Sequence, residues 1–224
     1  ANAAARALFD VGADEVIVWD AHGRGVNLCY DELDERCRIL LGAGHKGRFV
    51  GLDSGWTAVL FIGYHAMGGT KDAVLSHTFS SKTLQTYKLN GEFAGELAID
   101  AAYAGAHGVP VLFCASDDKC VAEARRTFGP IATVEAKRSL SWNSAISRHP
   151  AAVCKDIYRT VLEAAQKGAS AAPFTLPSPL PVEIRFPRAD LAAQARLTDK
   201  DGKPFAFTDA FTRVGVVQSV LDLF

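Results

Sequence analysis

Three short runs of apolar residues, separated by segments long enough to hold a helix, limit what this chain can fold into. The runs cover residues 15–20, 58–62 and 109–114 and are rich in valine, isoleucine and leucine. A continuous apolar run of this length is typical of a strand that is buried on both faces, as in a parallel sheet. Strands that alternate with helices predict an α/β fold, with a largely parallel sheet and helices on both of its faces.

Helix signals occur between and after these runs. The alanine-rich opening segment ends at Gly12 and reads as the second half of a helix, so we expect the natural protein to carry a preceding segment with a first strand. Capping residues, small residues and stop signals predict four further helices, over residues 31–41, 95–107, 117 or 118 to 128, and 150–167.

Two more segments carry strand and linker signals. A strand is predicted over residues 82–89, followed by Asn90-Gly91 as a hairpin turn. Four prolines between residues 172 and 181 indicate an extended linker or strap. Beyond it, a strand at 182–186, a helix near Ala189 and a strand near Phe205 predict a small C-terminal α+β subdomain. We therefore divide the chain into an α/β domain over 1–171 and a strap with subdomain over 172–224.

Composition excludes several classes of partner. The 24 basic and 25 acidic side chains leave a net charge of −1, and no polybasic run occurs, which argues against nucleic acid and anionic membranes. The longest apolar runs have the length of a strand, whereas a membrane-spanning helix needs roughly 20 residues. Five cysteines without a Cys-x-x-Cys pair are typical of free thiols, so we expect a cytoplasmic protein.

Histidines follow several of the predicted strands. His22, His65 and His77 come after strands or in the loops just beyond them, and Glu96 lies in the first turn of a predicted helix. Ligands of open α/β sheets bind at the carboxyl ends of the strands, where these side chains would meet. Imidazole nitrogens and a carboxylate oxygen are zinc ligands, and Asp20 could orient one imidazole. From spacing alone, structural histidines and a helix-terminal charge explain these residues about as well.

The motifs as a set resemble the zinc-dependent D-aminopeptidases of the DppA type. The resemblance runs from about residue 5 to 165, more loosely beyond, and rests on six stretches: 12–22, 61–66, 75–77, 95–97, 110–118 and 134–150. It implies a zinc aminopeptidase that removes N-terminal D-amino acids from short peptides. It also implies a homo-oligomer, built as pentameric rings that stack into decamers.

Residue by residue, the resemblance implies that His22, His65 and Glu96 bind metal and that His77 acts in catalysis. The family holds two zinc ions with the help of an Asp-x-Glu-Gly motif on a first strand, and this sequence contains no such motif. We therefore expect two zinc ions per subunit at most, with one or none as alternatives. His and carboxylate ligands would also suit manganese or cobalt.

Two other functions stay open at this point. A chain with an incomplete metal site could be a non-catalytic oligomeric ligand-binding protein. A complete site could instead serve a metal-dependent amidase or esterase of other specificity. The metal content of the protein and its action on D- and L-amino-acid amides would separate these functions.

Overall fold

A four-stranded sheet forms the centre of the molecule. The computed structural model describes residues 1–45, 47–168 and 172–224. In spatial order the strands of this sheet are β3 (Val59–Tyr64), β6 (Val111–Asp117), β7 (Ala132–Ser141) and β8 (Ser144–Ser147). β3, β6 and β7 are parallel, and β8 returns antiparallel to β7 at the edge.

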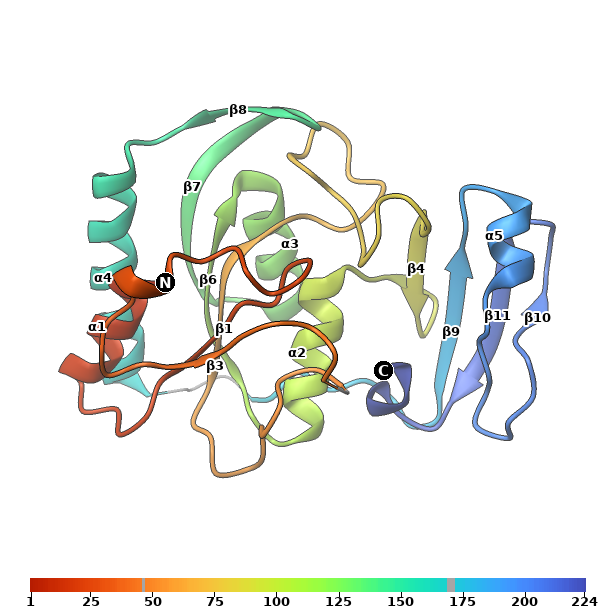
Figure 1. The fold of residues 1–224 in the computed structure, drawn as a ribbon, viewed down its shortest axis with the longest axis horizontal. Helices are drawn as coiled ribbons and strands as arrows, with labels where there is room; N and C mark the ends of the chain where they lie inside the picture. Colours follow the sequence, from red (N-terminus) through yellow and green to blue (C-terminus); the bar gives the residue numbers. More distant parts are fainter. Residues whose placement is uncertain (46, 169–171) are drawn as a thin grey trace.

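Helices cover both faces of this sheet (Figure 1). One face carries α1 (Asn2–Asp10) and α4 (Pro150–Lys167), and the other carries α2 (Glu96–Ala106) and α3 (Asp118–Phe128). Neighbouring residues of β6 point to opposite faces: Phe113 packs with α1 and α4, whereas Cys114 packs with α2 and α3. The predicted α/β class is therefore confirmed.

A second sheet lies beside the first and is antiparallel throughout. Its strands, in spatial order, are β10 (Ala206–Phe207), β11 (Thr212–Val217), β9 (Leu180–Arg185), β4 (Thr86–Leu89) and β5 (Glu92–Phe93). It packs with α5 (Ala189–Gln194) and with a final 3-10 turn, η2 (Val220–Leu223). The C-terminal strands thus pair with a hairpin from the middle of the chain. The predicted boundary at residue 171 adjoins residues 169–171, outside the described residues, and stays a prediction.

The proline-rich segment crosses helix α2. A Cβ atom at Gly105 would lie 1.9 Å from the carbonyl oxygen of Phe174, so glycine alone leaves room for the segment there. Phe174 thus packs directly on α2, and the chain enters the second sheet at Leu180, the first residue of β9 (Figure 1).

The helix predicted over residues 31–41 is wrong. A 3-10 turn, η1 (Tyr30–Glu32), is followed by strand β2 (Arg38–Leu40), which pairs in parallel with β1 (Ile17–Trp19). The Asp34 side chain accepts hydrogen bonds from the backbone and guanidinium of Arg36, and the Asp34 N–H donates to Asn2. Aspartate forms such local bonds in place of helical ones, and the pairing with β1 then favours a strand.

Other elements differ less. The strand predicted from residue 82 begins only at Thr86, because Thr83 and Leu84 turn back to the Ser80 carbonyl. Strands β7 and β8 have no counterpart among the predicted strands. Charged side chains interrupt the apolar pattern of β7, and β8 is a short run of serines with one alanine and one isoleucine. Within the part of the chain that the structure covers, no helix combines the length and apolarity that crossing a membrane requires.

Candidate metal and catalytic site

His65 directly follows β3, at the carboxyl edge of the central sheet. Gly63 has a φ of 76°, and the pairing of β3 with β6 shifts register between Ile62 and Tyr64. The Ser116 hydroxyl donates a hydrogen bond to the Tyr64 carbonyl just past this shift. Because glycine accepts a positive φ without strain, the strand changes direction at Gly63, and His65 follows at the rim of the sheet.

His77 lies on an irregular segment that the turn between β7 and β8 holds in place. The Leu75 N–H donates to the Trp142 carbonyl at 2.7 Å, and the Trp142 indole N–H donates to the Ser76 carbonyl at 3.2 Å. The His77 N–H donates to the Ala66 carbonyl at 3.2 Å. These bonds hold His77 next to Ala66, in the segment that follows β3.

Glu96 is the first residue of α2. The preceding Gly95 offers no side chain to cap the helix, and a carboxylate in this first turn is favoured by the positive end of the helix. The backbone N–H of Phe79 donates to Glu96 Oε1 at 2.7 Å. Glu96 is therefore both a helix-terminal charge and an acceptor that faces the segment after His77.

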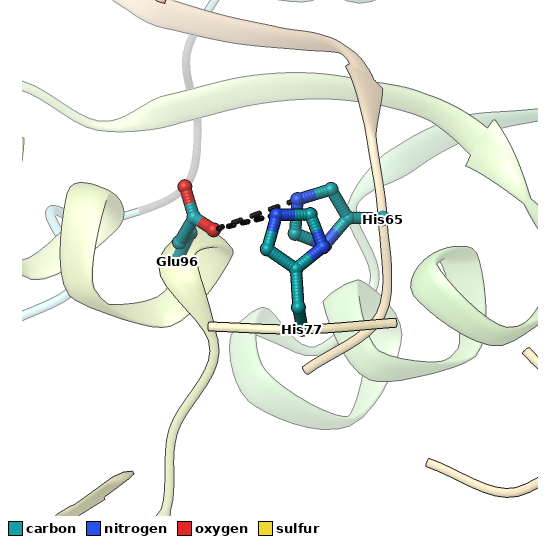
Figure 2. A group of neighbouring side chains, drawn as sticks. All are labelled: His65, His77 and Glu96. Atoms are coloured by element: carbon teal, nitrogen blue, oxygen red, sulfur yellow. Dashed lines mark ion pairs between the residues drawn. The ribbon is translucent and has the colours of Figure 1, made fainter. Parts of the chain in front are cut away.

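The three side chains converge on one point (Figure 2). Glu96 Oε1 lies 3.5 Å from His65 Nε2 and 3.8 Å from His77 Nε2. The two imidazole rings stack, with centroids 3.8 Å apart and planes inclined by 19°. One ligand atom from each residue lies within 4.8 Å of the other two. Two imidazole nitrogens and a carboxylate oxygen this close fit the donor set that zinc prefers.

The surroundings of His65 favour its neutral form. Burial lowers the pKa of His65 and outweighs the opposing attraction to Glu96, and the neighbouring His77 lowers this pKa further. Neutral imidazole is the form that binds metal. His65 Nδ1 lies 3.2 Å from the Ala66 carbonyl and His77 Nδ1 lies 2.5 Å from the Leu75 carbonyl. Each ring can donate through Nδ1, which leaves both Nε2 atoms with a lone pair toward Glu96.

His22 lies beside this group and is exposed. Its ring centroid is 6.0 Å from that of His77. Asp20, which is 4% exposed, accepts hydrogen bonds from the N–H groups of Asn27 and Leu28 at 2.5 and 2.9 Å. Burial favours the neutral acid, but a hydrogen bond from the Asn27 side-chain amide and these backbone bonds outweigh it and lower the pKa of Asp20. Asp20 therefore stabilises the loop that carries His22, where the sequence suggested a bond to an imidazole.

Comparisons with known proteins identify the family of this chain. The family model for M55 peptidases, described as D-aminopeptidase, matches residues 1–203. The chain belongs to the D-aminopeptidase family. The D-aminopeptidase of Bacillus subtilis (strain 168) is 30% identical over 190 residues, which cover 84% of this chain and 69% of that protein.

A solved structure of the D-aminopeptidase family is similar over nearly the whole chain. It is that of the Zn-dependent D-aminopeptidase DppA from Bacillus subtilis, described as a self-compartmentalizing protease. The TM-score is 0.90 at 27% sequence identity, and the match covers 98% of this chain and 79% of that chain. The resemblance predicted from the motifs is confirmed.

A buried ion pair that no sequence pattern predicts lies next to the site. Asp100, one turn after Glu96, is fully buried and accepts from Arg48 Nε and from the Tyr64 hydroxyl, each at 2.7 Å. Burial alone would lower the pKa of Arg48, but hydrogen bonds to Asp100 raise it above its usual range. Tyr64 immediately precedes His65, so this network ties β3 to α2. An isolated arginine and aspartate carry no sequence signal that would have revealed it.

Proposed function

We propose that this protein is a metal-dependent aminopeptidase that removes N-terminal D-amino acids from short peptides. The observation that carries the proposal is the convergence of His65, His77 and Glu96 at the rim of the sheet in a member of the D-aminopeptidase family. The B. subtilis proteins that the chain resembles are a D-aminopeptidase and a Zn-dependent D-aminopeptidase.

Zinc fits the residues present, and it is the metal named for the solved relative. By resemblance to the D-aminopeptidase family we assign His22, His65 and Glu96 as its ligands, and we leave His77, which also faces Glu96, for catalysis. Two imidazoles and a carboxylate leave a coordination position open for substrate. When bound, the metal would supply Lewis acidity toward the carbonyl group of the scissile bond. Two ions per subunit, as in the family, would need further carboxylates beyond these three residues. Elemental analysis of protein purified without chelator tests the stoichiometry.

His77 is assigned a different role, that of the residue acting directly in catalysis. Its Nδ1 faces the Leu75 carbonyl, so its Nε2 can take up and deliver a proton at the reaction site. Nε2 would take a proton from the water that attacks the scissile carbonyl and pass it to the leaving amine as the C–N bond breaks, which balances the hydrolysis of the peptide bond. Attack by His77 on the carbonyl itself is the alternative role for the same nitrogen.

The relative's self-compartmentalizing assembly suggests the quaternary structure. We extend this property to the present chain as a homo-oligomer, with pentameric rings stacked into a decamer as the arrangement to test by light scattering. A peptide substrate would then reach the site from inside the assembly. The cytoplasmic location rests on the cysteines, all five of which are free thiols in the structure.

Hydrolysis of D- and L-alanyl p-nitroanilide tests the activity directly. We expect the D-substrate to be cleaved faster, chelation to abolish the activity and zinc to restore it. His65→Ala should not recover with zinc, whereas His107→Ala, a histidine just past the far end of α2, should behave like the unmodified protein. Equal loss in both variants, or faster cleavage of the L-substrate, would contradict the proposal.

A further inference from the structure

A short loop after β3 joins the segments that carry the site. The Ala66 carbonyl accepts the N–H of His77 at 3.2 Å, and the Gly68 N–H donates to Thr78 Oγ1 at 3.1 Å. A Cβ atom at Gly68 would lie 2.7 Å from the Gln85 carbonyl oxygen, so the loop backbone is closely packed. The position of loop 66–68 therefore decides where His77 lies relative to β3.

The side chain of Glu123, on α3, contacts this loop. Its side chain is buried, with 3% of the residue exposed, and Oε2 accepts the N–H of Met67 at 2.8 Å. A Cβ atom at Gly95 would lie 2.7 Å from Glu123 Oε1 and 2.7 Å from Met67 Cβ. One carboxyl group thus touches both the residue two positions after His65 and the residue just before Glu96.

Stability alone does not account for a carboxyl group at this position. Among the described residues Glu123 Oε1 has no hydrogen-bond partner, and an unsatisfied buried polar atom costs about 1–3 kcal/mol. Burial raises the pKa of Glu123 although the bond from Met67 opposes this. The carboxyl group does lie at the N-terminus of α2, which no side chain caps, where a negative charge is favourable.

We propose that Glu123 is a positioning residue of the metal site, which fixes loop 66–68 against the start of α2 and so sets the separation of His65, His77 and Glu96. This inference rests on the proposed zinc-dependent function. Glu123 touches neither zinc nor substrate in this account. It acts through the backbone of Met67 and through the close contact with Gly95.

Three substitutions separate positioning from charge. Glu123→Gln keeps an acceptor for the Met67 N–H, Glu123→Leu removes it, and Glu123→Asp withdraws it by one methylene while keeping the charge. We expect the Leu and Asp variants to bind zinc about 10-fold more weakly or worse, the usual effect of losing a residue that orients metal ligands. At saturating zinc their kcat should fall with little change in KM, whereas Glu123→Gln should retain both zinc affinity and kcat.

Val161→Ala is the matched control for simple loss of stability. Val161 is fully buried in α4, on the opposite face of the sheet, so its truncation should lower the melting temperature and leave the zinc affinity unchanged. Zinc affinity, measured by competition with a chromophoric chelator well below the melting temperature, is the deciding quantity.

The outcomes distinguish this inference from the function on which it rests. If the unmodified protein binds no zinc, the metal proposal is overturned and the positioning role with it. If the unmodified protein binds zinc and the Leu and Asp variants bind it equally well, only the positioning role is overturned. Weak binding by Glu123→Gln, matching that of Glu123→Leu, would also overturn it, because the acceptor would then be irrelevant.

Discussion

Helix α2 carries two carboxylates one turn apart, and their surroundings differ in kind. Asp100 is fully buried and paired with the guanidinium of Arg48. Glu96 lies near the surface of the same helix, and its side chain is 14% exposed and faces the imidazoles of His65 and His77. A guanidinium neutralises its partner permanently, whereas neutral imidazoles can share a cation with theirs. Asp100 therefore serves the stability of the fold, whereas Glu96 is available to bind a cation.

Substitution of the histidines that face Glu96 should have the largest effect on catalytic activity. His77→Ala should lower kcat by about 10²- to 10⁴-fold, the usual contribution of a general acid or base, and leave the zinc content unchanged. His65→Ala should lose zinc first and activity as a consequence. Zinc analysis beside steady-state kinetics separates the two. Turnover at the normal rate by His77→Ala would remove its catalytic role.

The next effect concerns the partner of Asp100. Arg48→Ala leaves a buried carboxylate without its cation, and we expect the free energy of unfolding to fall by about 3–5 kcal/mol. Urea denaturation measures this loss, and the double variant Arg48→Met/Asp100→Leu should recover much of it. A loss below about 1 kcal/mol, the value for an exposed ion pair, would show that the Arg48–Asp100 pair contributes little to the stability of the fold.

Glu123 offers a third case, a buried carboxyl group with only one of its oxygens satisfied. Its pKa is raised above 4.5, so the folded state holds the proton more tightly than the unfolded chain. The resulting stability is fully present below pH 4.5 and is lost as the pH rises through the folded pKa.

Glu123→Gln should therefore match the unmodified protein at low pH and exceed its stability at neutral pH. The gain should be about 1.4 kcal/mol for each unit by which the pKa is raised. Urea denaturation over a pH series, with chelator present in both samples, measures the difference. A difference that does not change with pH would show that this carboxyl group has an ordinary pKa.

Much of the fold follows from local signals. α3 begins where Asp117 accepts the N–H groups of Lys119 and Cys120, as predicted from its place after an apolar run. α2 ends before Gly108 as its small residues and stop signal predict. Helix caps and stop residues act within one or two turns, so they are visible in a window of sequence.

Pairing between distant segments is what the local patterns did not predict. Residues 38–40 form a strand because they pair with residues 17–19, and the intervening segment gives no sign of that partner. The C-terminal strands likewise join residues 86–89, which lie far away along the chain. Pairing across such distances depends on the whole fold and overrides local propensity.

The same distinction between local patterns and long-range contacts applies to the candidate site. The amino-acid sequence by itself suggested His22, His65, His77 and Glu96 as one candidate set, because residues that follow strands lie at the rim of an α/β sheet, and the family resemblance then gave each of them a role. Only the tertiary structure decided that three of them converge while His22 lies beside them, and that Arg48 and Glu123 support the group from within. Convergence, burial and the resulting pKa shifts depend on atoms brought together from distant parts of the chain, and that information is absent from any local pattern of residues.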